Sequence, residues 1–335
     1  MARRVESINR TGPLMITFQR TSFLAAIALW IGCHGVWAAP QDTKQTGKSD
    51  NRNFTEVRLT LDKSGLLNME ADVEGVKMNL ILDTGCYTTV IHKSSAKKAG
   101  LKPIGKSTAA AGNASVETDR THIGKLLLAG SSFKTQAIIM DLTEVNKNRL
   151  AAGSTFCDGL LGGDFLFEHA AVIDYQRLRI YLREPNKKPG RIGDKLKGNR
   201  TVEVSMKLDK RHCYAMKTMV EGRSTFLMLD TGATQTTLDQ ATAKSAKAKL
   251  EDISDSATAA GVLKRQGGAI EHFSIGSIVE KVFFTTWEMD AGNAFRKKDG
   301  EPLLSGVLGS DFLKKHAALI DYGSNTLFLR PTEIK

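Results

Sequence analysis

Apolar residues in this chain come mostly as short β-prone runs that glycine or charged residues interrupt, a pattern typical of strands joined by tight turns. The runs of the first half are Glu56–Leu61, Leu66–Val73 and Lys77–Leu82. Those of the second half are Val202–Leu208, Tyr214–Val220 and Thr225–Leu229. Two closing hairpins are predicted, Val172–Asp174 with Leu178–Leu182 and Leu319–Asp321 with Thr326–Leu329.

Helical segments are expected to be short and few. Two of them follow Asp-Thr-Gly triplets, at Lys93–Ala99 and Asp239–Lys247. Two more follow Leu-Gly-x-Asp-Phe segments and run toward His169 and His316. The chain is therefore predicted to have an all-β fold with short helices.

A long internal repeat dominates the organisation of the chain. The segment Leu82-Asp83-Thr84-Gly85 recurs 147 positions later as Leu229-Asp230-Thr231-Gly232. The same offset relates Leu161-Gly162-Gly163-Asp164 to Leu308-Gly309-Ser310-Asp311, and Ile173-Asp174-Tyr175 to Ile320-Asp321-Tyr322. Such a constant register indicates a duplication. We expect one lobe at 54–184 and a second at 201–335, joined by a charged linker at 185–200 that contains Pro and Gly.

The N-terminus has the pattern of a secretory signal. An apolar run at 23–31 follows Arg20, and small residues near Val36-Trp37-Ala38 suit cleavage after Ala38. Residues 1–38 are therefore interpreted as a signal peptide, and polar residues 39–53 as a disordered segment. We expect export to the periplasm or the medium, with no stable membrane insertion after processing. An uncleaved membrane anchor is the alternative.

Composition narrows the function classes. The formal net charge is +11, and removal of residues 1–38, with four Arg and one Glu, would leave +8. The basic residues are scattered, which favours a solvated basic surface over nucleic-acid binding. Three cysteines would remain after processing, Cys86, Cys157 and Cys213. Because their number is odd, at most one internal disulfide is possible. The sequence has no Cys-x-x-Cys or His-x-x-x-His spacing, and we expect neither a metal nor a cofactor.

The two triplets carry the candidate chemistry. An apolar run should deliver Asp83 at a strand end, and Gly85 permits the tight turn that follows; Asp230 and Gly232 repeat this arrangement. If the two units pack about a pseudo-twofold axis, the carboxyl groups meet and share one proton. One oxygen can then act as general base on a water molecule while the other carboxyl group protonates a scissile carbonyl.

With these motifs the chain resembles the retropepsin-like aspartic proteases of the bacterial type, with both halves fused in one polypeptide. The family pattern adds two apolar residues plus Gly, here Leu160-Leu161-Gly162 and Val307-Leu308-Gly309, and an Ile/Val-Asp-Tyr tail, here Ile173-Asp174-Tyr175 and Ile320-Asp321-Tyr322. The resemblance covers almost the whole chain from residue 56. It implies two pseudo-symmetric β-barrel lobes around a central active-site cleft.

The resemblance also implies roles for individual residues. Asp83 and Asp230 would be catalytic, and Thr84 and Thr231 would interlock beneath them. Glycine-bearing hairpins would close over an extended peptide or protein substrate. The candidate hairpin glycines are Gly112 in one lobe and Gly261, Gly267 and Gly268 in the other. The matched Asp164, Asp311, His169 and His316 are interpreted as structural.

One departure from the family pattern bears on pH dependence. Many members follow the triplet with Ser, Thr or Ala, whereas this chain has Cys86 in one unit and Ala233 in the other. Neither residue supplies a strong donor to the carboxylate. We therefore predict a dyad pKa that is less depressed than in hydroxyl-bearing relatives, and activity at mildly acidic to near-neutral pH.

Two alternatives stay open at the level of sequence. A catalytically inactive module could capture extended peptides or an envelope polymer without cutting them. Alternatively, each unit could pair with the same unit of another chain. The duplication makes such a dimer unnecessary, so we expect a monomer in which Asp83 and Asp230 meet within one polypeptide.

Overall fold

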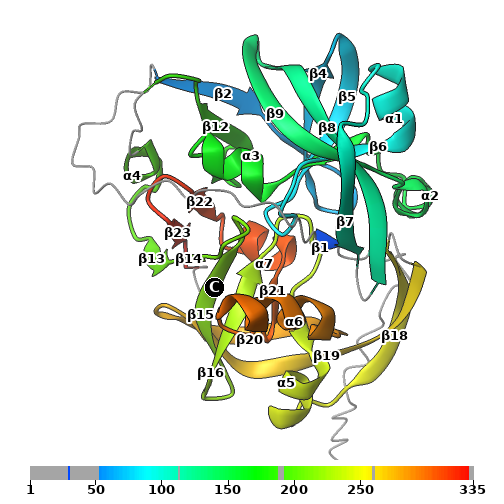
Figure 1. Cartoon of the computed structure of the whole chain (residues 1–335). Helices are drawn as coiled ribbons and strands as arrows, with labels where there is room; N and C mark the ends of the chain where they lie inside the picture. Colours follow the sequence, from blue (N-terminus) through cyan, green and yellow to red (C-terminus); the bar gives the residue numbers. More distant parts are fainter. Residues whose placement is uncertain (1–28, 31–52, 112–113, 188–191, 259–260, 332–335) are drawn as a thin grey trace, which may run out of the picture.

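The computed structural model describes residues 29–30, 53–111, 114–187, 192–258 and 261–331. Figure 1 shows two lobes, the first built from the blue-to-green half of the chain and the second from the green-to-orange half. Apart from Leu29–Trp30 and Asn53, the predicted signal peptide and the segment 39–53 lie outside the described residues. Among the described helices none is long and apolar enough to cross a membrane.

The first lobe is a closed six-stranded barrel. Its strands follow the order β8-β9-β6-β10-β5-β4, and β4 pairs back with β8. They are β4 (Leu67–Val73), β5 (Val76–Leu82), β6 (Val90–His92), β8 (Ala114–Leu128), β9 (Ser131–Met140) and β10 (Gly159–Leu161). The short β3 (Thr60–Leu61) extends the sheet beside β4, and β7 (Gly105–Ala111) forms a hairpin with β8. The two-residue strand β1 (Leu29–Trp30) pairs antiparallel with β7.

The second lobe repeats this barrel. The strand order is β15-β16-β21-β17-β20-β19, closed by pairing of β15 with β19. The strands are β15 (Tyr214–Val220), β16 (Arg223–Leu229), β17 (Thr237–Asp239), β19 (Gly261–Ile275), β20 (Ile278–Trp287) and β21 (Gly306–Leu308). A hairpin of β18 (Glu251–Thr258) with β19 corresponds to β7–β8, and β14 (Lys207–Leu208) pairs with β15.

A third sheet joins the lobes. Its order is β13-β23-β22-β11-β12-β2, with three strands from each half of the chain. They are β2 (Phe54–Arg58), β11 (Val172–Asp174), β12 (Arg179–Arg183), β13 (Val202–Ser205), β22 (Leu319–Asp321) and β23 (Thr326–Leu329). Ile173 pairs with Ile320 at the centre, so matched residues of the two repeats face each other about the pseudo-twofold axis. This sheet contains both predicted closing hairpins, which are confirmed.

The predicted helices are present as α1 (Lys93–Lys98), α3 (Gly163–Glu168), α5 (Gln240–Ser245) and α7 (Ser310–Lys315). The sequence analysis missed α2 (Thr143–Ala151) and α6 (Asp290–Asp299), together with α4 (Ile192–Leu196) inside the predicted linker. The buried face of α2 explains its omission, because it includes the polar Asn146 and Arg149 and so lacks an apolar stripe.

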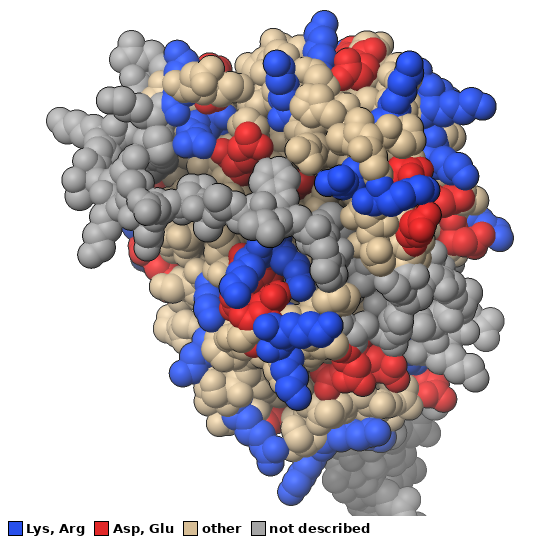
Figure 2. Space-filling view, in the orientation of Figure 1, with Lys and Arg blue, Asp and Glu red and all other residues tan. Residues whose placement is uncertain are grey.

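The basic character of the chain is spread over its surface. Figure 2 shows Lys and Arg distributed over the drawn face of both lobes, with Asp and Glu interspersed among them. Several exposed cations pair with carboxylates, for example Lys106 with Asp119 at 2.9 Å. Such a mixed surface fits a solvated exterior better than an electrostatic track for a polyanion.

Candidate active site

The two Asp-Thr-Gly triplets lie at the ends of matched strands. Asp83 follows β5 and Asp230 follows β16, and each strand runs parallel to the short apolar strand that precedes Gly162 or Gly309. The backbone N–H of Asp83 donates to the Leu161 carbonyl at 3.1 Å, and that of Asp230 donates to the Leu308 carbonyl at 3.1 Å. The apolar-apolar-Gly segments therefore hold in place the loops that carry the two Asp-Thr-Gly triplets.

The structure brings the two carboxyl groups together from opposite lobes. A Cβ added at Gly85 would lie 2.4 Å from Cγ of Asp230, and one added at Gly232 would lie 2.4 Å from Cγ of Asp83. Each glycine backbone thus lies directly against the carboxyl group of the other lobe. Any side chain at either position would collide with that group, which is the physical reason for glycine in both triplets.

The two threonines interlock beneath the aspartates. The hydroxyl of Thr84 donates to the Leu229 carbonyl at 2.9 Å and accepts from the Thr231 backbone N–H at 3.0 Å. In return the hydroxyl of Thr231 donates to the Leu82 carbonyl at 2.6 Å and accepts from the Thr84 N–H at 3.1 Å. Four buried hydrogen bonds therefore join the two Asp-Thr-Gly loops to each other.

Backbone donors fix one oxygen of each carboxyl group. Oδ1 of Asp83 accepts from the N–H groups of Gly85 and Cys86, both at 3.0 Å. Oδ1 of Asp230 accepts from Gly232 at 2.8 Å and from Ala233 at 3.0 Å. These bonds orient both groups in the same way relative to their loops.

Burial controls the protonation of the pair. Both aspartates are fully buried. Desolvation, followed by the neighbouring charge of Asp230, raises the pKa of Asp83 well above its ordinary value. Desolvation also raises the pKa of Asp230 to about 6, against the opposing effect of its backbone donors. Two carboxyl groups in contact cannot both ionise readily, so the pair holds one proton over a range of pH.

The residues after the triplets supply no donor from their side chains to the aspartates. The thiol of Cys86 donates instead to the Thr88 carbonyl at 3.0 Å, and Ala233 is apolar. Cys86, Cys157 and Cys213 are free thiols and all are buried. Burial raises the pKa of the Cys86 thiol well above its ordinary value, which keeps it in the unreactive thiol form.

The candidate hairpin glycines of the second lobe all lie in β19, which forms a hairpin with β18. Gly112 lies outside the described residues, and Gly261 is the first residue of β19. Gly267 lies opposite Glu251 of β18, and on the other side of β19 Gly267 and Gly268 pair with Thr285 and Phe284 of β20. A Cβ at Gly268 would lie 2.7 Å from the Lys249 carbonyl, so close backbone packing explains that glycine.

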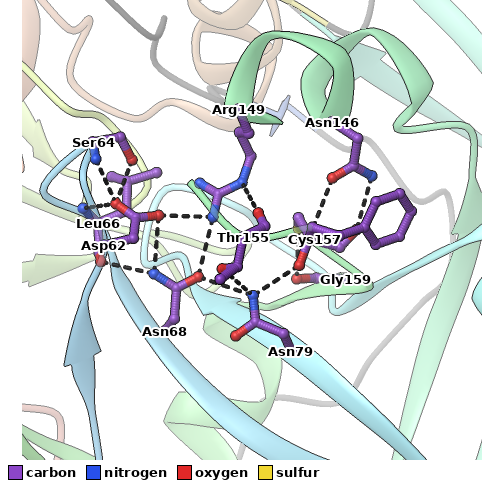
Figure 3. A network of polar contacts seen from close by, with 11 residues as sticks. Asp62, Ser64, Leu66, Asn68, Asn79, Asn146, Arg149, Thr155, Cys157 and Gly159 are labelled. Atoms are coloured by element: carbon purple, nitrogen blue, oxygen red, sulfur yellow. Dashed lines mark hydrogen bonds and ion pairs between the residues drawn. The ribbon is translucent and has the colours of Figure 1, made fainter. Parts of the chain in front are cut away.

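The sequence analysis missed a buried polar network that holds α2 (Figure 3). Arg149 donates to Oδ2 of Asp62 at 2.7 Å and to Oδ1 of Asn68 at 3.2 Å. The second lobe repeats the ion pair between Arg296 of α6 and Asp209 at 2.6 Å. Because these pairs obey the same 147-residue offset as the triplets, the repeat register was a signal that could have found them.

This network also bears on how the two lobes meet, because α2 contacts β18 of the opposite lobe. Asn146 also fastens the segment that leads into β10, accepting from the Cys157 N–H at 2.7 Å and donating to the Cys157 carbonyl at 2.9 Å. The buried pairs thereby fix the loop between β9 and β10, whose far end carries the apolar strand beside Asp83.

The other matched residues have structural contacts. Asp164 accepts from the backbone and hydroxyl of Thr89, both at 3.0 Å, and Asp311 repeats these contacts with Thr236 at 2.8 and 2.9 Å. Nδ1 of His169 lies 3.0 Å from the Arg183 carbonyl. Within the described parts of the chain, no group of three His, Cys, Asp or Glu side chains is arranged to hold a metal ion.

Comparisons with known proteins agree with this geometry. Residues 69–165 match the family profile described as aspartyl protease. Residues 216–315 match the gag-polyprotein aspartyl protease family. No curated protein matches the chain significantly. Each match contains one Asp-Thr-Gly triplet and one apolar-apolar-Gly strand, so the two matched regions correspond to the two barrels. In both of its halves, this chain therefore belongs to the retropepsin-like aspartyl proteases, with two repeated lobes in a single polypeptide.

Proposed function

We propose that this protein is an exported endopeptidase that hydrolyses peptide bonds with water activated between Asp83 and Asp230. The observation that carries the proposal is the approach of the two carboxyl groups, each lying against the glycine of the opposite triplet. Both aspartates and both threonines of the pattern are present, and all four hydrogen bonds between the loops are made. A binding module without activity would have no need of this complete arrangement.

The mechanism follows from the shared proton. The ionised carboxylate takes a proton from water, whose oxygen bonds to the scissile carbonyl carbon, while the protonated carboxyl group gives its proton to the carbonyl oxygen. The tetrahedral intermediate then collapses as the C–N bond breaks. The amine leaves with the proton of the dyad, and one hydroxyl group of the intermediate gives its proton back to the dyad as the product carboxyl group forms. No covalent enzyme intermediate forms, and the pair returns to its singly protonated state.

Substrates of this enzyme are peptides bound in an extended conformation. The hairpins β7–β8 and β18–β19 present backbone groups with which an extended chain can pair, and pairing of this kind gives affinity without regard to side chains. The N-terminal apolar run supports export to the periplasm or the medium, and the internal pseudo-dimer supports a monomer. The raised pKa of Asp230, to about 6, supports activity from mildly acidic to near-neutral pH.

The test compares the purified protein with Asp83→Asn and Asp230→Asn on a diverse peptide library from pH 4 to 7.5, with and without a statine-type inhibitor. A matched control is Asp72→Asn, since Asp72 lies in β4 near its turn to β5, at the opposite end of β5 from the triplet. We expect cleavage by the wild type and the control, inhibition by the statine group, and loss of at least about 1,000-fold in both dyad variants. Absence of cleavage by the folded wild type at every pH would favour a peptide-binding module.

A further inference from the structure

The two catalytic loops differ in the residue that lies beneath them. Gly163 and Ser310 occupy matched positions, and their backbone N–H groups donate to the matched Cys86 and Ala233 carbonyls at 2.7 and 2.8 Å. Ser310 adds a hydroxyl group, which donates to the Thr231 carbonyl at 2.9 Å. The Tyr175 hydroxyl lies 3.0 Å from the same serine oxygen, and both contacts are buried.

The direction of each hydrogen bond follows from chemistry. A carbonyl oxygen can only accept, so the single hydroxyl proton of Ser310 is directed to Thr231 and Tyr175 must donate to Ser310. The Thr231 carbonyl belongs to the same peptide group as the Gly232 N–H, which donates to Oδ1 of Asp230 at 2.8 Å. A chain of hydrogen bonds therefore runs from Tyr175 through Ser310 and one peptide group to Asp230.

The first lobe lacks this chain. Its counterpart of Tyr175 is Tyr322, whose buried hydroxyl has no hydrogen-bond partner within the described part of the structure. Gly163 has no side chain, and a Cβ there would lie 2.6 Å from the His212 carbonyl oxygen. A serine is therefore excluded at this position by the backbone of the second lobe. The Gly85 N–H still donates to Asp83, at 3.0 Å, but no side chain of the described residues donates to the Thr84 carbonyl of the same peptide group.

We propose that Ser310 and Tyr175 are positioning residues that favour the ionised form of Asp230, so that Asp230 is the general base and Asp83 the general acid. The proposal rests on the proposed function. Hydrogen bonds in a chain polarise one another, so a donor to the Thr231 carbonyl strengthens the bond from the Gly232 N–H to the carboxylate. The Ser310 hydroxyl has no equivalent on the side of Asp83, so Asp83 holds the proton of the dyad.

The surroundings of the dyad support this assignment. Besides Asp83, the titratable groups that influence or are influenced by Asp230 are Cys86, Cys213 and Tyr175. Burial raises the pKa of each of these three groups, so they stay neutral between pH 4 and 7. Asp311 lies near Tyr175, but it does not distinguish the two lobes, because its counterpart Asp164 makes the same contacts in the first lobe. The hydroxyl chain is thus a difference between the lobes that favours ionisation of Asp230.

The test uses three single-atom or near single-atom changes in the full chain. Ser310→Ala and Tyr175→Phe each break the chain, whereas Tyr322→Phe removes a matched hydroxyl that has no hydrogen-bond partner among the described residues. We expect the acid limb of the pH profile of kcat/KM to move up by about 0.2 to 0.6 pH unit in the first two variants, from a cooperative strengthening of 10–30% per bond. Tyr322→Phe should leave the acid limb in place.

A second readout does not depend on turnover. Carbon-13 NMR of aspartate carboxyl groups, assigned with Asp83→Asn and Asp230→Asn, follows the ionisation of each carboxyl group directly. In the wild type the Asp230 signal should titrate first, and Ser310→Ala should raise its midpoint. Equal shifts in Tyr175→Phe and Tyr322→Phe, or first ionisation at Asp83, would overturn the proposal. Absence of peptide cleavage with the expected titration would refute the protease function and leave the polarised chain established.

Discussion

The interlocked threonines offer the sharpest test of what joins the catalytic loops. Replacement of Thr84 by Val keeps the shape of the side chain and removes only the hydroxyl group. Thr84 is fully buried, so water cannot replace the lost contacts. The substitution leaves the Leu229 carbonyl and the Thr231 N–H without the partners that lie at 2.9 and 3.0 Å.

The expected loss follows from these two orphaned groups. A buried donor or acceptor left unsatisfied costs about 1–3 kcal/mol, so Thr84→Val should lower the free energy of unfolding by about 2–6 kcal/mol. Activity should fall as well, because both loops carry a catalytic carboxyl group and a shift of about 1 Å at a reacting group can cost about 100-fold in rate.

The assay is equilibrium denaturation in urea, with kcat/KM measured on a peptide that the wild type cleaves. Thr84→Ser is the matched control, since it keeps the hydroxyl and removes one methyl group, at a cost of about 1 kcal/mol. Thr231→Val should behave as Thr84→Val does. The double variant should lose less than the sum of the two, because both belong to one network. If Thr84→Val were as stable and as active as Thr84→Ser, the four bonds would not be what holds the loops together.

Two further predictions concern buried charges. Arg149→Met should lower the free energy of unfolding by about 3–5 kcal/mol in denaturation experiments, because it leaves the buried Asp62 without its cation. The control is Arg179→Met, at the more exposed pair with Glu56, which should cost at most about 1 kcal/mol. Equal losses in the two variants would contradict this reasoning. Burial raises the pKa values of Asp83, Asp230 and Asp164, the last two to about 6, so between about pH 4 and 6 the folded state binds more protons than the unfolded state. Stability should therefore fall as pH rises through this window, and the fall should be smaller in Asp83→Asn/Asp230→Asn; an unchanged slope would show that the dyad carboxyls are not the cause.

Local pattern and repeat register account for what the sequence predicted well. Residues close together in the chain determine the strands beside each triplet, the four short helices and the two closing hairpins. Because of the duplication, the sequence pattern of each of these elements occurs twice. The pairing of Asp83 with Asp230 could be inferred for the same reason, because a two-fold arrangement of equal units places equal residues at the axis. The structure brings those two residues together, as predicted.

Helix α2 could not be recognised from hydrophobic periodicity. The buried side of α2 includes Asn146 and Arg149, and only partners distant in the sequence make that burial favourable. The positions of Gly267 and Gly268 within a strand could not be recognised from the sequence for a similar reason. Glycine is common in turns, and only the neighbouring Lys249 backbone shows that these residues belong inside a strand.

By itself, then, the sequence of this protein determined the duplicated unit, its strand-rich class and the identity of the two aspartates. Only the tertiary structure decided which strands close each barrel, how deeply the dyad is buried and why the two catalytic loops differ. Ser310 and Gly163 are visible in the sequence as one mismatch among many. That mismatch acquires meaning through the Tyr175 hydroxyl on one side and the His212 carbonyl on the other, groups separated from it by many residues along the chain. Periodicity reports which face of a segment is apolar, whereas hydrogen bonds between distant groups depend on distances that only packing sets.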